Sequence, residues 1–205
     1  MISKLSLHLE TGCLRIAAVG PFHAIEMASS FKVKYPGISV EMQFGNSQET
    51  LESLQSLESD IAILAAVTEN PNIVMKHYSK HKVIVFVNRD HRFFDRDSVK
   101  LAEQQDENFI LREKGSTTRQ AFDNALSLHG VTVNNVMEIG SREGVWKAVL
   151  LGLGISVVAD FEFVATPELR TVDIEDVEIE TNYFITYLRD REDAAIIKAF
   201  IDLNF

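Results

Sequence analysis

Four short turns rich in glycine, serine and threonine are the part of this sequence best suited to binding a small molecule. Each turn comes after an apolar, β-branched run and before a segment with apolar residues at helical spacing. A helix N-terminus has unpaired backbone N–H groups and a positive dipole end, so a turn of this kind favours an anionic group. The turns lie at residues 20–23, 45–47, 115–118 and 140–141.

Basic side chains gather beside the third and fourth turns, although the chain as a whole is acidic, with a formal net charge of −10. They are Arg112, Lys114, Arg119 and Arg142. Because a guanidinium group fits a phosphate or a carboxylate with two parallel hydrogen bonds, these residues indicate a pocket for a phosphate, a phosphonate or a carboxylate. Two alternatives remain open: the arginines pair with Glu113 or Glu143 at the surface, and the serines and threonines only cap helices.

No pattern in the sequence demands an enzyme or a metal. It contains neither a nucleophile elbow nor a phosphate-binding Walker loop. His77 and His81 have the spacing of some zinc ligands, but no acidic third ligand is spaced nearby. The segment 152–154 (GLG) stands between a helix and a strand, the reverse of the order in a dinucleotide fingerprint, and indicates a helix end. We therefore expect no catalytic residues, no metal and no cofactor.

Strands and helices alternate along the chain, which predicts βαβ units with the four turns at the carboxyl ends of strands. Strands are expected at residues 13–19, 39–44, 60–65, 82–87, 108–112, 136–139, 155–159 and 183–188. Helices are expected at residues 24–35, after 47 with Leu51, Leu54 and Leu57 on one face, at 118–129, from Ser141 to Gly152, and at 194–203. The turn at 45–47, Ser116 and Ser141 offer N-caps.

The four turns fall into two pairs, one for each of two expected lobes. The polar residues 88–91 follow a strongly apolar strand and mark the entry to a second lobe, where the strand–helix alternation begins again. Because ligands bind outside the carboxyl ends of strands in open α/β sheets, a cleft between the lobes is implied. We expect a first lobe of residues 11–86 and 182–205, a second of residues 87–181, and a leading segment 1–10 that is a linker remnant or an artificial start.

The composition excludes several classes of protein. A hydrophobic fraction of 46% indicates a folded core and sets disorder aside. The negative net charge opposes binding to DNA, because DNA affinity comes largely from neutralising phosphates. No stretch approaches the roughly 18 apolar residues that would span a bilayer, and the first ten residues lack the pattern of a signal peptide. We expect a cytoplasmic protein with no membrane role.

Over nearly its whole length the sequence resembles the effector-binding domain of LysR-type bacterial transcription regulators. The resemblance rests on the order and spacing of several short sequence segments. They are 12–18 (GCLRIAA), Phe31 with 35–37 (YPG), 45–47 (GNS) with Leu51, 60–63 (DIAI), 112–119 (REKGSTTR), 152–155 (GLGI) and 198–200 (KAF). The segments 112–119 and 138–143, followed by Ala148-Val149, look like the branch of this family associated with aminoethylphosphonate catabolism.

This resemblance implies an α/β fold of the type 2 periplasmic-binding-protein class, with two Rossmann-like lobes joined by two crossover strands and a small effector in the cleft between them. It implies effector contacts at Pro21, Phe22, His23, Asn46, Ser47, Ala66, Val67, Ser116, Thr117 and Ser141. In the aminoethylphosphonate branch, Arg112, Arg119 and Arg142 would hold the phosphonate and Glu143 or Glu113 would meet the amine. Trp146 departs from the pattern and would narrow the pocket. His23 is the least specific of these residues, since a lone histidine as often packs or caps.

The resemblance also implies partners. A homodimer, or a tetramer of the full-length regulator, would form through the helices 24–35 and 118–129, and DNA would be reached only through a winged helix-turn-helix domain that precedes this segment and is missing from it. The main alternative from another class is a solute-binding protein of a transport system. An enzyme on the same fold is a third alternative, for which only His23 offers a candidate.

Overall fold

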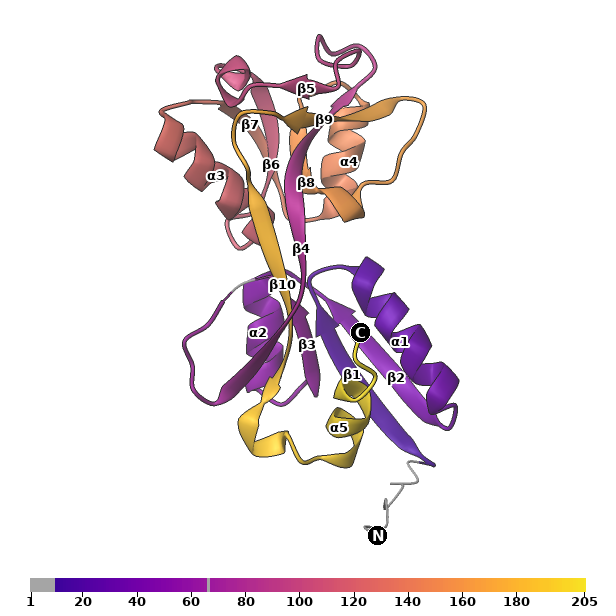
Figure 1. Ribbon diagram of the computed structural model, residues 1–205. Helices are drawn as coiled ribbons and strands as arrows, with labels where there is room; N and C mark the ends of the chain where they lie inside the picture. The colour runs from indigo at the N-terminus through magenta and orange to yellow at the C-terminus, as the bar shows by residue number, and fades with distance from the viewer. Residues whose placement is uncertain (1–9, 66) are drawn as a thin grey trace. The chain divides into compact units, whose positions relative to one another are not determined.

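Residues 10–65 and 67–205 are described by the computed structural model, and they divide into two compact units. The first unit comprises the chain up to Ser79 together with Asn182–Phe205, and the second comprises Lys80–Thr181. The chain passes between them twice, within β4 (Ile73–Asn88) and near the start of β10 (Glu180–Leu188) (Figure 1). The sequence analysis expected these changes after residues 86 and 181, whereas the division of the structure falls after Ser79 and Thr181.

The first unit is built on a sheet whose strands follow the order β2-β1-β3-β10. Its strands besides β10 are β1 (Gly12–Ala18), β2 (Ile38–Phe44) and β3 (Ile61–Leu64). β1 lies parallel to both of its neighbours, whereas β10 pairs antiparallel with β3. The helices α1 (Pro21–Lys34) and α2 (Ser47–Gln55) connect the parallel strands, so the predicted βαβ order is confirmed.

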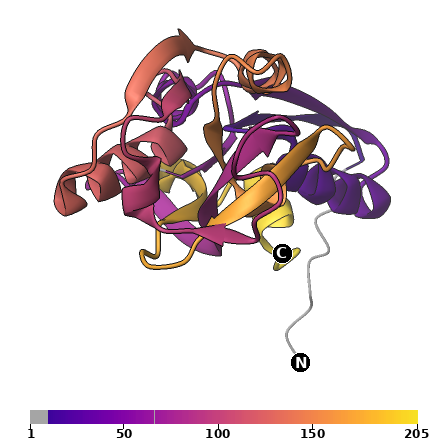
Figure 2. The ribbon, with the colours of Figure 1, turned by 90° about the horizontal axis from the view of Figure 1, so that it is seen from above.

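The helices of the first unit cover both faces of this sheet. Alternate residues of β3 belong to different apolar clusters: Ile61 and Ile63 pack with α1 and α5 (Ala195–Ile201), whereas Ala62 and Leu64 pack with Leu54 of α2. The buried residues of α1 recur at helical spacing and end in Phe31. Figures 1 and 2 show α1 running beside β1 and β2 from two directions.

The second unit combines two short sheets. The C-terminal half of β4 pairs antiparallel with β8 (Ser156–Ala159) and β9 (Leu169–Ile174), and β9 also pairs with β5 (Ser98–Val99). Beside them β6 (Asn108–Arg112) and β7 (Asn134–Ile139) form a parallel pair. The helices are α3 (Thr117–His129) and α4 (Arg142–Leu150), with single 3-10 turns η1 (Leu101–Gln104) and η2 (Asp160–Glu162); a third turn, η3 (Arg189–Arg191), belongs to the first unit.

β6 ends at the turn that precedes α3, and helices cover the strand on both faces. Phe109 and Leu111 pack in one cluster with Phe122 of α3, whereas Ile110 between them packs in another with Val149 of α4. Because successive side chains of a strand point to opposite faces, α3 and α4 lie on opposite sides of β6. β6 and β7 are parallel, and α3 begins shortly after the end of β6 and α4 shortly after the end of β7, so both helices start near the same end of the pair.

The predicted helix ends are confirmed in two places and wrong in one. Gly130 closes α3 in the left-handed conformation, with φ 65°. After α4, Gly152 has φ 75° and the N–H of Leu153 donates to the carbonyl of Ala148, so the GLG segment is a helix end rather than a nucleotide loop. The expectation that Leu57 extends the apolar face of α2 is wrong, because α2 ends at Gln55 and Leu57 is half exposed.

Candidate functional site

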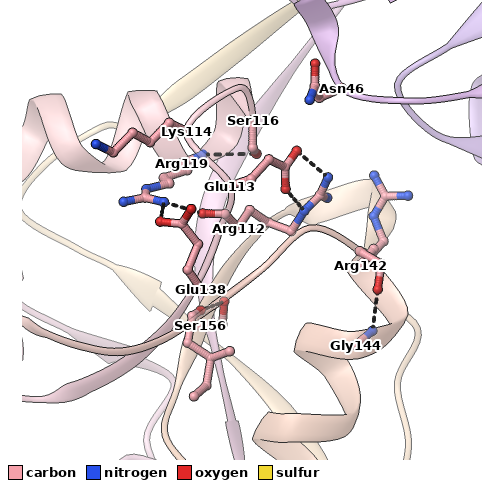
Figure 3. Close-up of polar contacts among 12 residues, drawn as sticks. Asn46, Arg112, Glu113, Lys114, Ser116, Arg119, Glu138, Arg142, Gly144 and Ser156 are labelled. Atoms are coloured by element: carbon pink, nitrogen blue, oxygen red, sulfur yellow. Dashed lines mark hydrogen bonds and ion pairs between the residues drawn. The ribbon is translucent and has the colours of Figure 1, made fainter. Parts of the chain in front are cut away.

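The two helix N-termini of the second unit are capped by the predicted serines. Ser116 Oγ accepts the N–H of Arg119 at 3.4 Å at the start of α3, and Ser141 Oγ accepts the N–H of Gly144 at 3.1 Å at the start of α4 (Figure 3). A Cβ atom on Gly144 would lie 2.8 Å from Ser141 Oγ, which explains the glycine there. Capping is therefore one role of both serines, and their contact with a ligand stays a prediction.

Arg112, the last residue of β6, forms a two-pronged ion pair with the residue that follows it. Its Nε donates to Glu113 Oε2 at 2.8 Å and its Nη2 donates to Glu113 Oε1 at 3.0 Å (Figure 3). Both side chains are about one-fifth exposed, at 19% and 23%. The pairing with Glu113 that the sequence left open is thus present, and the guanidinium keeps one edge toward other partners.

Arg119 ties three elements together from inside the second unit. It donates to Glu138 of β7 at 2.6 Å and to the carbonyl oxygen of Arg112 at 2.5 Å (Figure 3). It also donates to Asp123 of α3 at 3.2 Å. Burial alone would lower the pKa of Arg119, but the bonds to Glu138 and Asp123 raise it above its ordinary value. These contacts are structural, and the predicted role of Arg119 in ligand binding stays a prediction.

Arg142 begins α4 and pairs with a residue that the sequence did not single out. Its Nη2 donates to Glu162 Oε1 at 2.6 Å, and Glu162, at the end of η2, is only 4% exposed. Burial raises the pKa of the Glu162 carboxyl, against the opposing charges of Arg142, Arg112 and His81. Glu143, one of the two acidic partners that the sequence left open, is exposed. The only sequence signal for Glu162 was its place just after a buried strand.

In the first unit, Pro21, Phe22 and His23 form the first turn of α1, with proline at the start of the helix. The ring of His23 stands edge-on to Tyr78 and Tyr183, with ring centres 5.0 and 5.8 Å apart. Aromatic packing of His23 is therefore present, and its contact with a ligand stays a prediction.

Asn46 and Ser47 lie at the start of α2, and the side chain of each accepts a hydrogen bond from a backbone N–H of the first unit. Asn46 forms a capping box, accepting the N–H of Glu49 at 3.0 Å while its own N–H donates to Glu49 Oε2 at 2.8 Å. Ser47 is buried and its Oγ accepts the N–H of Ala65 at 3.4 Å. Val67 is 74% exposed, and Ala66 lies outside the described residues.

A cavity of about 290 Å³ lies in the first unit between the end of β2 and α2. Glu49 and Glu58 are among its lining residues, so its charge does not suit an anion. Over residues 10–65 and 67–205, no three His, Cys, Asp or Glu side chains are grouped so that they could hold a metal ion. No helix of these residues is long and apolar enough to cross a membrane.

Comparison with known proteins identifies relatives across almost the whole chain. The family model of the LysR substrate binding domain matches residues 8–203. CmpR, a transcriptional activator of Synechocystis, and a RuBisCO operon transcriptional regulator of Acidithiobacillus ferrooxidans are each 29% identical over 202 residues, or 96% of this chain. The chain spans 66% and 65% of the length of these two relatives, just under two thirds.

Solved structures agree with this result. The regulatory domain of CcmR from Synechocystis PCC6803, in complex with 2-PG, is 29% identical with a TM-score of 0.85, covering 94% of this chain and 95% of its own. The effector binding domain of QuiR, in complex with shikimate, has the same TM-score and covers 94% of each chain, but at 18% identity it supports the fold alone.

These relatives are transcription regulators rather than enzymes or transport proteins, in agreement with the expectation that the chain is not an enzyme. The matched structures also confirm the expected type 2 periplasmic-binding-protein-like α/β fold. The chain belongs to the family of LysR substrate-binding domains.

Proposed function

We propose that this chain is the effector-sensing part of a LysR-type transcription regulator and that it binds a small anionic molecule at the start of α3 and α4. The observation that carries the proposal is the placing of Arg142 as the first residue of a serine-capped helix, where its guanidinium and the helix dipole both favour a negative group. Arg112 contributes a second positive charge, since the carboxyl of Glu162 interacts with both arginines.

The two units would serve as the two lobes of the sensor, joined by β4 and β10. The proposed effector contacts of the second unit are Ser116, Thr117 and Ser141, and those of the first unit are the turns that start α1 and α2. A ligand that binds one lobe arrangement more tightly than another shifts the population toward it, and only such a difference in affinity can carry a signal to a DNA-binding domain.

The proposed ligand is a phosphate, a phosphonate or a carboxylate. The similar CcmR domain is in complex with 2-PG, and the likeness to the aminoethylphosphonate branch suggests a phosphonate. Regulators of transcription act beside DNA, so we place the protein in the bacterial cytoplasm, with DNA contacted by a winged helix-turn-helix domain preceding this segment.

We further propose a homodimer formed through α1 and α3. Ile25 and Val33 on α1 are 51% and 83% exposed, and Leu128 on α3 is 82% exposed, so both helices present apolar side chains to a partner. Sedimentation of the wild type and of Leu128→Asp tests the dimer. A wild type that remains a monomer at roughly tens of micromolar would count against it.

A thermal-shift titration tests the anion site. The ligands are 2-PG, 2-aminoethylphosphonate, phosphate and simple dicarboxylates, each applied to the wild type, Arg142→Ala and Ser116→Ala. Ligand at about 100 times its dissociation constant should add roughly 2.7 kcal/mol to the stability of the wild type. Both variants should lose this gain, whereas Lys147→Ala, at an exposed position of the same helix, should keep it. If no anion stabilises the wild type, the proposed site is wrong.

A further inference from the structure

The proposed anion site contains a buried carboxylate, Glu162, which would repel a bound anion. The side chain of Glu162 is 5% exposed and accepts a hydrogen bond from Arg142, the residue best placed to meet the ligand. An anion bound at Arg142 would therefore come close to a second negative charge in a poorly hydrated place.

The surrounding charges do not relieve this conflict, because each cation near Glu162 already has an acidic partner. The groups that face it are the cations Arg142 from α4 and Arg112 from β6, and His81 from β4, which is positively charged only when protonated. Arg142 pairs with Glu162 itself, Arg112 with Glu113, and His81 Nδ1 lies 2.8 Å from Asp160 Oδ1. An added anion would therefore leave the cluster with at least one negative charge in excess, even when His81 is protonated.

A proton on one of the three carboxylates restores the balance, and burial decides which of them takes it. The side chains of Glu113 and Asp160 are 23% and 43% exposed and can keep their hydration, whereas Glu162 cannot. Burial also raises the pKa of Glu162, which makes the neutral form the more accessible. Protonated Glu162 gains an O–H group that can donate to the ligand.

We propose that binding of the anionic effector is coupled to the uptake of one proton by Glu162, which then donates a hydrogen bond to the bound anion. This inference rests on the proposed function and names the residue that sets the charge of the ligand accepted. No covalent step is involved: the proton comes from solvent, and the Arg142 guanidinium, freed from an ionised partner, turns its charge to the ligand.

The sign of the pH effect follows from linkage. A bound anion raises the pKa of Glu162 above its value in the free protein, so between these two values binding takes up a proton. Affinity should be highest below the pKa of the free protein and should fall as the pH rises, by at most about tenfold per pH unit for one proton.

Calorimetric titration of the full chain tests the proposal, with sulfate as a probe whose charge is constant and 2-PG as a second probe. Each titration is run in two buffers of different ionisation enthalpy, from about pH 5.5 to about pH 8, so that the protons taken up are counted directly. Within this pH range, binding of the anion to the wild type should take up close to one proton. Trp146 is the only tryptophan, and its ring lies 5.4 Å from that of Phe163, next to Glu162, so its fluorescence provides a second signal.

Glu162→Gln imitates the neutral carboxyl and gives the decisive comparison. It should bind both probes at least as tightly as the wild type at the upper end of the range, with an affinity for sulfate that depends less on pH than that of the wild type and with one proton fewer taken up. Glu168→Gln removes an exposed carboxylate of the same unit and should behave as the wild type.

Several results would overturn the inference while leaving the proposed function intact. They are anion binding by the wild type without proton uptake, equal uptake in Glu162→Gln, and loss of binding in a folded Glu162→Gln protein. A zwitterionic ligand could give a further contradicting result. If 2-aminoethylphosphonate binds the wild type without proton uptake and binds Glu162→Gln more weakly, the ionised carboxylate accepts a hydrogen bond from the amine instead. If neither probe binds the wild type at all, the proposed function fails first. Should Glu162→Gln not fold, the wild-type proton count alone decides.

Discussion

Replacing Arg119 with methionine should lower the free energy of unfolding by about 2–3 kcal/mol, because this arginine holds α3, β6 and β7 together. Its side chain is 9% exposed and makes three hydrogen bonds, to two carboxylates and one backbone carbonyl. Methionine keeps most of the volume of the stem, so the loss should come from the polar contacts rather than from a cavity.

The magnitude follows from how exposed the partners are. Hydrogen bonds to charged groups are worth about 1.5–3 kcal/mol each, which for three bonds would far exceed the expected loss. However, the carboxylates of Asp123 and Glu138 are each 45% exposed, so water can solvate them once the arginine is gone. We therefore reduce each ion pair to at most about 1 kcal/mol and add about 1 kcal/mol for the carbonyl bond.

Urea unfolding followed by circular dichroism and by Trp146 fluorescence measures the change. Arg170→Met is the matched control, since Arg170 also binds one carboxylate and one backbone carbonyl but is 42% exposed and faces an almost fully exposed Asp97. Its loss should stay below about 1 kcal/mol. If Arg119→Met is as stable as the control but no longer binds the anion that stabilises the wild type, Arg119 belongs to the ligand and the structural role assigned to it is wrong.

Three further changes test other parts of the structure. Asp60→Asn should cost about 2–4 kcal/mol, because Asp60 is 4% exposed and its carboxylate accepts hydrogen bonds from two arginines. Burial alone would raise the pKa of Asp60, but these hydrogen bonds lower it. The stabilisation is therefore present above the ordinary aspartate pKa and is lost as the pH falls through the lowered pKa, which urea midpoints measured at acid pH would follow. Ser156→Ala should cost about 1–2 kcal/mol in urea unfolding, because the buried hydroxyl donates to a carbonyl of β6 at 2.6 Å. Gly130→Ala should lower the melting temperature, at a cost of about 1 kcal/mol, since φ is 65° at an otherwise open position. Gly140→Ala, equally open and without a positive φ, should be close to neutral, and an equal loss in both variants would remove the backbone explanation.

The local parts of the fold could be predicted from sequence because each has a short-range cause. Alternating strands and helices, the caps at Ser116 and Ser141 and the helix end at Gly130 all depend on residues within a few positions of one another. By contrast β9 was missed, since its residues 169–174 mix charged and apolar side chains and run into an acidic segment. Its strand character comes from pairing with β4, which is distant in sequence.

Of the ion pairs at the candidate site, the sequence offered that of Arg112 with Glu113 as an alternative, but it did not offer that of Arg142 with Glu162. The arginines were expected beside the third and fourth turns, and they lie there, yet the partner of Arg142 is twenty positions along the chain from it. No periodicity connects these two residues; they meet because β8 returns the chain to the start of α4 through η2. Long-range ion pairs of this kind depend on tertiary packing, which local pattern does not contain.

The three arginines of the second unit are paired with carboxylates, and this pairing bears on how the proposed site could select among anions. If Arg112, Arg119 and Arg142 acted as an unpaired basic patch, any polyanion would be attracted, with the strong salt dependence of surface electrostatics. Each of the three instead has a carboxylate within 3.2 Å, so the resting cluster has little net charge to attract an ion from a distance. If the proposed site is right, its affinity would come from groups that act at contact: the capped helix N-termini, the Arg142 guanidinium, and the Glu162 carboxyl, which would be neutral in the proposed complex. A site built in this way discriminates by hydrogen-bond geometry and protonation state, which suits a sensor that has to recognise one small anion among many.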